Sequence, residues 1–262
     1  MLKVDSDGES HGVGWGASPE ERRAIARWLI EAAAGLVGYG FILFLSAGRL
    51  DWFWGWVALA LFGLVLAAHP LILLRINPGL LAERQRGLRD PRVAAWDRRL
   101  VALAGGSMLL SWAVAGLDTR FGWTGPMPTL YHVGGLALAA LGYGLFLWAM
   151  ASNAFFAEGV RIQGERGHTV ATGGPYRYVR HPGYAGGILS FLGIPLLLGS
   201  VWALMPAGMA TALYVRRTAL EDTTLMGELP GYAEYARRTH YRLLPGVWRP
   251  CTPAPRGSPT PW

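Results

Sequence analysis

The stretch YAGGILSFLGIPLLLGSVWALMPAGMATALYV, residues 184–215, runs for about 30 positions without a charged side chain. An α-helix needs about 20 residues to cross roughly 30 Å of bilayer hydrocarbon, so this stretch is too long for one span. Gly199 and Ser200 near its middle predict a tight turn, and Pro195 and Pro206 are candidate kinks. The stretch therefore predicts a hairpin of two short membrane helices, with a re-entrant pair as the alternative.

Four further apolar runs precede the hairpin, at about residues 25–47, 52–74, 100–117 and 131–150. Each is close to the length of one membrane crossing. The composition agrees, because charged residues make up only 16% of the chain, against about 25% in a typical soluble domain. The mean hydropathy is +0.26, and 12 tryptophans suit the membrane–water boundary. His69, in the second run, is expected to pack between helices, with the lining of a substrate cavity as the alternative.

These observations predict an all-α, polytopic transmembrane bundle of about six spans, the last two forming the hairpin. Four segments are expected. They are a flexible N-terminal segment (residues 1–20), membrane helices 1–4 (21–151), a functional core with a cytoplasmic loop, the hairpin and a C-terminal helix (152–248), and a Pro-rich tail (249–262).

Arginines are concentrated in alternate loops. They are dense in residues 75–99, in residues 161–180 and from residue 216 onward, whereas the loop between the third and fourth runs contains only Arg120. Cytoplasmic loops carry such an excess of basic residues. We therefore expect a multi-pass protein of the bacterial inner membrane with both termini in the cytoplasm. The net charge of +7 is explained by these loops and does not indicate nucleic-acid binding.

The connector between the fourth run and the hairpin is unusually long. Residues 152–184 read SNAFFAEGVRIQGERGHTVATGGPYRYVRHPGY, whereas helix–helix connections usually take two to eight residues. Its prolines fix φ and its glycines permit conformations closed to other residues, so the segment can present backbone groups to a ligand. Two other interpretations stay open: its Arg and Tyr residues can anchor in lipid headgroups, and His168 can be an ordinary loop histidine.

Two further patterns follow the hairpin. Arg217 and Glu221 are four residues apart and share one helix face; they form either a functional pair at a membrane mouth or a surface ion pair. Pro230 and Gly231 then precede a short amphipathic segment, which ends in an extended exit at residues 244–245. Alone, this segment is typical of an interfacial helix.

Taken in order, these pieces resemble the isoprenylcysteine carboxyl methyltransferase family, a relative of the phospholipid methyltransferases. The resemblance covers residues 152–248. It consists of the Gln163…His168-Thr169-Val170-Ala171 stretch, the Gly-Pro-Tyr-x-x-x-Arg-His-Pro-x-Tyr run, the Arg217/Glu221 pair, and the Gly-Tyr-x-x-Tyr segment with its Leu-Pro exit. Residue 222 is Asp where that family often shows a second glutamate.

The resemblance implies an S-adenosylmethionine-dependent methyltransferase that releases S-adenosylhomocysteine and lacks a Rossmann domain. It implies Arg217 and His181 as catalytic residues, with Arg217 holding the substrate. The implied cofactor contacts are Gln163, His168, Thr169, Val170, Ala171, Tyr176, His181, Pro182, Gly183, Tyr184 and Glu221. No metal site is expected, and the single cysteine, Cys251, excludes an internal disulfide.

Membrane lipids and a lipophilic small-molecule or prenylated acceptor are the expected partners. A carboxylate leads among acceptors because it is already ionised at pH 7, and an arginine can orient it through two hydrogen bonds. An amine on a phospholipid is second, and would need a base such as His181. A small thiol is third. An NADPH-dependent membrane reductase and a transporter are the alternatives from other classes.

Overall fold

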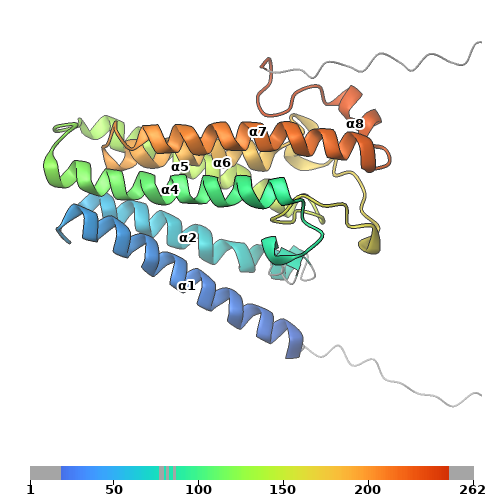
Figure 1. Ribbon diagram of the computed structural model, residues 1–262, viewed down its shortest axis with the longest axis horizontal. Helices are drawn as coiled ribbons and strands as arrows, with labels where there is room; N and C mark the ends of the chain where they lie inside the picture. The colour runs from blue at the N-terminus through green and yellow to red at the C-terminus, as the bar shows by residue number, and fades with distance from the viewer. Residues whose placement is uncertain (1–18, 77–79, 81–82, 85–86, 248–262) are drawn as a thin grey trace, which may run out of the picture.

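The computed structural model describes residues 19–76, 80, 83–84 and 87–247 (Figure 1). Almost all of the segment expected to be flexible, and the whole Pro-rich tail with Cys251, lie outside the described residues. The regular secondary structure of the described residues is helical, apart from one isolated bridge between Leu244 and Val247. The predicted all-α fold class is therefore confirmed.

The long helices lie alongside one another in a bundle, with α8 and the irregular segments gathered at one end (Figure 1). They are α1 (Pro19–Ala47), α2 (Phe53–Ile76), α4 (Ala95–Phe121), α5 (Thr129–Ala151), α6 (Pro182–Leu198) and α7 (Leu204–Glu228), followed by the short α8 (Tyr232–Arg238). The first described residues of α1 lie at the same end of the bundle as α8 (Figure 1).

Four of these helices are long and apolar enough to cross a membrane, namely Ala26–Ala47 of α1, α2, α4 and α5. They correspond to the four predicted runs. Helix α6 is apolar but has only 17 residues, which is about 25 Å at 1.5 Å per residue. Helix α7 has an apolar first half and a charged second half. The bundle is thus polytopic, and its last two helices differ from the first four.

The turn between α6 and α7 lies where the sequence predicts it. Gly199 ends α6 with φ of 76°, a left-handed conformation that favours glycine, and its N–H donates to the carbonyl oxygens of Leu196 and Pro195. Pro195 lies inside α6, whereas Pro206 lies in the first turn of α7, where a proline needs no intrahelical donor. The predicted helical hairpin is therefore confirmed.

Asp118 joins this turn to the end of α4, far from α8. Its carboxylate accepts hydrogen bonds from the Thr124 backbone N–H at 2.7 Å and from the Ser200 hydroxyl at 2.5 Å. The Thr124 hydroxyl donates to the same carboxylate. Asp118 is only 3% exposed, so these donors compensate for burying its charge.

Small residues bring α5 and α6 into backbone contact. A Cβ atom built on Gly142 of α5 would lie 2.5 Å from the Gly186 carbonyl oxygen, and one on Gly193 of α6 would lie 2.5 Å from the Ala139 nitrogen. Small residues at such spacing are the usual means by which membrane helices approach closely. Because α6 begins where the long insert ends, this contact fixes the position of the insert on the bundle.

We therefore expect Gly142→Ala to destabilise the protein by about 1–3 kcal/mol, because the added methyl forces α5 and α6 apart. Gly144→Ala on the same helix is the matched control, since a Cβ there meets no atom within 4 Å. That change should stabilise the helix by about 0.5–1 kcal/mol. Thermal unfolding of the purified protein in detergent measures both variants, and equal shifts would contradict close packing at Gly142.

Candidate functional site

The insert and the segment after α7 pair with each other at one end of the bundle. The backbone N–H groups of Arg180 and His181 donate to the carbonyl oxygens of Tyr241 and Arg242, each at 2.9 Å. The Tyr235 hydroxyl of α8 donates to the Tyr176 carbonyl oxygen at 2.7 Å. These two stretches, which are separated in the chain by α6 and α7, therefore fold against each other.

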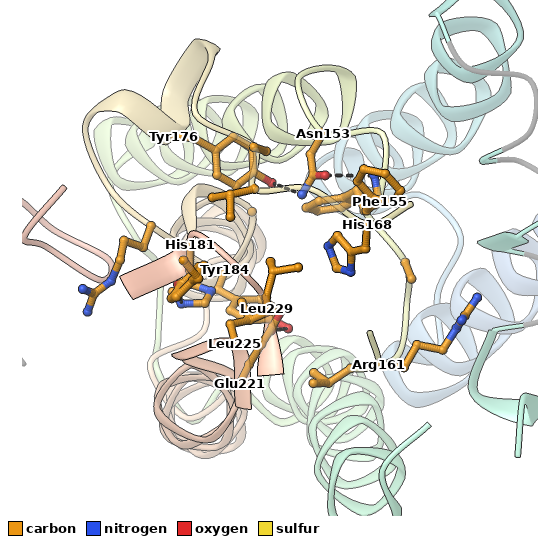
Figure 2. Close-up of a pocket in the computed structure, with 18 of the residues that line it drawn as sticks. Asn153, Phe155, Arg161, His168, Tyr176, His181, Tyr184, Glu221, Leu225 and Leu229 are labelled. Atoms are coloured by element: carbon orange, nitrogen blue, oxygen red, sulfur yellow. Dashed lines mark hydrogen bonds between the residues drawn. The ribbon is translucent and has the colours of Figure 1, made fainter. Parts of the chain in front are cut away.

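A cavity of about 100 Å³ lies between these two stretches (Figure 2). Most of the expected site residues line it: His168, Thr169, Val170, Ala171, Tyr176, His181, Gly183, Tyr184, Arg217 and Glu221. Figure 2 shows side chains of α7, including Glu221 and Leu225, across the cavity from Phe155 and His168 of the insert. Arg161 also lines it but directs its guanidinium away, to an ion pair with Glu83.

Gln163 and Pro182 are not among the lining residues. The side chain of Gln163 is fully buried, donates to the Phe155 carbonyl oxygen at 2.9 Å, and accepts from Arg166 at 2.5 Å. Its backbone N–H donates to Nδ1 of His168 at 3.2 Å. Pro182 is the first residue of α6. Both residues shape the backbone around the cavity, and their contact with a cofactor stays a prediction.

The face that insert residues present to the cavity is aromatic. The Phe155 and His168 rings stack with centroids 4.5 Å apart, and the Arg166 guanidinium lies 5.4 Å from the Phe155 ring centre. Burial lowers the pKa of His168, and the positive charges of Arg161 and Arg166 lower it further. The imidazole is therefore neutral at pH 7. It stacks on Phe155 and accepts the hydrogen bond from the Gln163 N–H, and it carries no charge.

Asn153 is a lining residue that the sequence analysis did not single out. Its side-chain amide donates to the Tyr176 hydroxyl at 3.2 Å, and its side-chain oxygen accepts from the Phe155 N–H at 2.9 Å. It joins the start of the insert to the Gly-Pro-Tyr turn. An Asn directly after an apolar run is a weak signal, because the same residue is common in ordinary helix ends.

Adjacent acidic residues on α7 face in different directions. The Tyr184 hydroxyl donates to the carboxylate of Glu221, which lines the cavity. The carboxylate of Asp222 is instead buried among donors and accepts from Tyr232 and Arg242, each at 2.9 Å, and from His181 Nε2 at 3.2 Å. Glu221 is therefore the acid available to a ligand, and Asp222 holds the surrounding segments together.

The pKa of Asp222 lies well below its ordinary value. Burial opposes ionisation of this carboxylate, but the hydrogen bond and charge of His181, the charge of Arg180 and the hydrogen bond from Tyr232 outweigh it. The carboxylate is therefore ionised at neutral pH. Nε2 of His181 lies in this cluster, 3.3 Å from the Tyr232 hydroxyl, so it is already engaged with protein groups.

Arg180 is a buried cation with unused donors. Its Nη2 donates to Asp222 at 3.1 Å, and its Nε lies 3.0 Å from the same carboxylate. Its Nη1 has no hydrogen-bond partner among the described residues, although the side chain is fully buried and lines the cavity. A buried guanidinium nitrogen without an acceptor is costly, so this atom indicates where an anionic ligand group would bind.

Arg217 is held more firmly than the resemblance implies. Its Nε and Nη2 bind the two carboxylate oxygens of Asp97 at 2.6 and 3.0 Å, and Nη2 also donates to the Glu158 carbonyl oxygen at 2.5 Å. Asp97 is fully buried. These bonds use Nε and Nη2 of the guanidinium, while Arg217 also lines the cavity, so its role as the substrate-holding group stays a prediction.

Asp97 also fixes the insert. Its Oδ2 accepts the Val160 backbone N–H at 2.8 Å, so one carboxylate of α4 joins the insert to α7. The sequence analysis missed Asp97. This residue lies just before the third apolar run, beside Arg98 and Arg99, and such a charged cluster is typical of an exposed loop.

A second, larger cavity of about 580 Å³ opens among α1, α2, α5, α6 and α7. Its lining is largely apolar and aromatic, and includes Phe62, Leu66, Tyr143, Phe146, Phe191 and Tyr214. His69 lines it as well, as the alternative interpretation of this residue predicts. Rings separate the two cavities: Tyr184 contacts Tyr214 at 5.5 Å between centroids, and Phe156 contacts Phe146 at 5.3 Å.

Fold and site together define an integral membrane protein in which a polar cavity at one end of a helical bundle adjoins an apolar cavity inside it. Within that class, residues 130–229 match the family model for phospholipid methyltransferases. The matched segment runs from the start of α5 to the end of α7 and is similar to that family.

The chain is also similar to the cobalt-zinc-cadmium resistance protein CzcN of Cupriavidus metallidurans. The two are 32% identical over 118 residues, which is 45% of this chain and 49% of the relative. The chain thus matches about half the length of that protein. Among the described residues of this chain, no three His, Cys, Asp or Glu side chains gather in a way that could hold a metal ion.

Replacing Asp97 by Leu should destabilise the protein by about 3–5 kcal/mol, because Arg217 would be left as an unpaired buried charge. The double variant Asp97→Leu/Arg217→Met should recover most of that loss, since it removes both charges. Asp118→Leu is a control at the far end of α4, and combining it with Arg217→Met should give additive losses. Chemical unfolding in detergent measures these four variants together with Arg217→Met alone, and additive losses at Asp97 and Arg217 would contradict the pair.

Proposed function

We propose that this protein is an S-adenosylmethionine-dependent methyltransferase acting on a lipid-like acceptor within the membrane. The observation that carries the proposal is the polar cavity. Its lining includes the carboxylate of Glu221, to which Tyr184 donates, and Arg180, whose Nη1 has no hydrogen-bond partner among the described residues. It lies beside a largely apolar cavity that is large enough for a lipid chain. The match of residues 130–229 to the phospholipid methyltransferases supports the same activity.

The residues of the cavity suit the parts of this cofactor. Its amino-acid end carries an ammonium and a carboxylate, which Glu221 and Arg180 can bind through charge-assisted hydrogen bonds. Its sulfonium and adenine suit aromatic faces such as those of Tyr176 and Tyr184. Gly183 allows the Phe156 ring, which also lines the cavity, to pack against the start of α6, since a Cβ there would lie 2.7 Å from the ring atoms.

The closed cavity implies movement on binding. Its volume of about 100 Å³ is below the roughly 300 Å³ at which small-molecule pockets begin. Thr169 is exposed and Val170 partly exposed, so residues 168–171 form the wall that can be displaced at least cost. We therefore propose that this part of the insert moves outward to admit the cofactor and returns over it, which also excludes water.

When bound, S-adenosylmethionine supplies an electrophilic methyl group: a lone pair of the acceptor forms the new bond to the methyl carbon while the carbon–sulfur pair returns to sulfur, giving neutral S-adenosylhomocysteine. The protein's part is to orient donor and acceptor and exclude water, a contribution worth on the order of 7–11 kcal/mol. A carboxylate acceptor requires no base, and carboxyl O-methylation is the proposed reaction.

Amine N-methylation of a phospholipid is the second candidate, and the matched family favours it. It requires a base to remove an ammonium proton. His181 lines the cavity, but its Nε2 is 3.2 Å from Asp222 and 3.3 Å from Tyr232. Because Nε2 donates to Asp222, the nitrogen of His181 that would accept the ammonium proton is Nδ1. A carboxylate acceptor stays the first candidate because it needs no such base.

We also propose that the site faces the cytoplasm, with both termini on that side of a bacterial inner membrane. The arginine-rich loops support this orientation. The described ends of the chain lie at the same end of the bundle as the cavity (Figure 1).

Calorimetric titration with S-adenosylhomocysteine tests the activity class. The parent protein should bind it, and Glu221→Gln should weaken binding by roughly tenfold or more, because the ammonium loses a charged acceptor. Glu234→Gln on α8 is the control, since Glu234 is exposed and pairs only with Arg237 and Arg238 among the described residues. That variant should bind like the parent.

Parallel titration with NADPH separates the reductase alternative. Binding of NADPH in place of S-adenosylhomocysteine would overturn the methyltransferase proposal. Transfer of labelled methyl to oleate, to a phosphatidylethanolamine or to a small thiol then distinguishes the acceptor classes. Transfer only to the phospholipid amine would replace the carboxyl reaction by the second candidate.

A further inference from the structure

The second cavity has a polar end that the proposed function does not yet use. Arg84 is the one Lys or Arg among its described lining residues, which are otherwise largely apolar. The side chain of Arg84 is 13% exposed. A guanidinium at the end of an apolar cavity is costly to bury unless it meets acceptors, and in membrane proteins such groups commonly take part in function.

Protein groups fix the position of Arg84 without using all its donors. Nη1 donates to the Phe156 carbonyl oxygen at 3.0 Å, and Nη2 lies 3.5 Å from the Glu158 carboxylate, a long contact. The guanidinium also lies 5.6 Å from the centre of the Phe156 ring. A guanidinium has five N–H donors. These contacts therefore orient the guanidinium plane and leave some of its N–H groups for a ligand.

Arg84 lies next to the wall between the two cavities. Phe156, whose carbonyl oxygen Arg84 binds, lines the first cavity, and its ring contacts Phe146 of the second. A headgroup held by Arg84 would therefore be one aromatic side chain away from the cofactor cavity. The apolar lining beyond Arg84 would accommodate the attached chain.

Arg217, the arginine that the resemblance assigns to the substrate, lines the first cavity and not the second. Its Nε and Nη2 are paired with Asp97 at 2.6 and 3.0 Å. An acceptor carboxylate could take these two donors only by displacing a fully buried one. Arg84 has no comparable partner among the described residues, because its contact with Glu158 measures 3.5 Å and the Glu158 side chain is 45% exposed.

We infer that Arg84 binds the anionic oxygens of the methyl acceptor's headgroup, a carboxylate or a phosphate, at the cytoplasmic end of the second cavity. This inference rests on the proposed function and names the residue that selects the acceptor. Glu31 and Glu158 share the same lining, so the cavity carries no general positive potential. An anionic group must therefore bind to Arg84 itself, and the selectivity depends on that single side chain.

Binding of radiolabelled oleate, oleoyl lysophosphatidic acid and oleyl alcohol to the purified protein tests this assignment. The three probes share one chain, and only the first two carry an anion. The parent should bind at least one anion roughly tenfold more tightly than the alcohol. Arg84→Gln should abolish that preference while leaving the affinity for oleyl alcohol unchanged. Whichever anion the parent prefers identifies the carboxylate or the phosphate as the recognised group.

Two controls keep the outcomes distinct. Arg120→Gln, at the far end of α4, should bind all three probes like the parent. S-adenosylhomocysteine titration of Arg84→Gln should match the parent, which shows that the variant is folded. An anion preference that persists in Arg84→Gln, or a parent that does not distinguish anion from alcohol, would overturn the inference. If the parent protein itself does not bind S-adenosylhomocysteine, that result would instead contradict the proposed function.

Discussion

The site depends on one buried ion pair, between Asp97 of α4 and Arg217 of α7. Asp97 is fully buried, so its charge is tolerable only because Arg217 binds both oxygens and the Val160 N–H donates to one of them. The same guanidinium holds the Glu158 carbonyl oxygen. The start of the insert therefore takes its position from two side chains on different helices, 120 positions apart in the chain.

A second buried carboxylate performs the matching task on the C-terminal side. Asp222 gathers donors from the Arg-His pair before α6, from α8 and from the exit segment. Neither of these two carboxylates is among the residues that line the cavity, whereas Glu221 is. The structure thus separates acids that hold the site together from the one that can meet a ligand.

Much of this arrangement could be predicted from the sequence because its signals are local. Uncharged runs of membrane length predicted the helices, Gly199-Ser200 predicted the turn, and the Gly- and Pro-rich insert predicted a site between α5 and α6. The predicted helix ends differ from the observed ones by a few residues, because helix ends are set by capping rather than by hydropathy.

The remainder could not be predicted, because it depends on which faces of the helices meet. Helix α2 is apolar all round, so periodicity does not indicate which of its residues, His69 included, faces a cavity. Asp97 and Arg84 find partners 120 and 72 residues away. Both lie outside residues 130–229, so the family match does not include them. Asp97, outside the matched segment, thus helps to hold the cavity wall through its contact with the Val160 N–H.

Helix α7 runs without a break from the bundle interior to the cofactor cavity. Tyr214 on this helix lines the apolar cavity, whereas Arg217, Glu221 and Leu225, further along it, line the polar one. A proposed lipid chain packed against Tyr214 would therefore act on the same helix that presents Glu221. If it shifted that helix, binding in the two cavities would be coupled, and linkage would make the coupling reciprocal: each ligand would change the affinity for the other by the same factor.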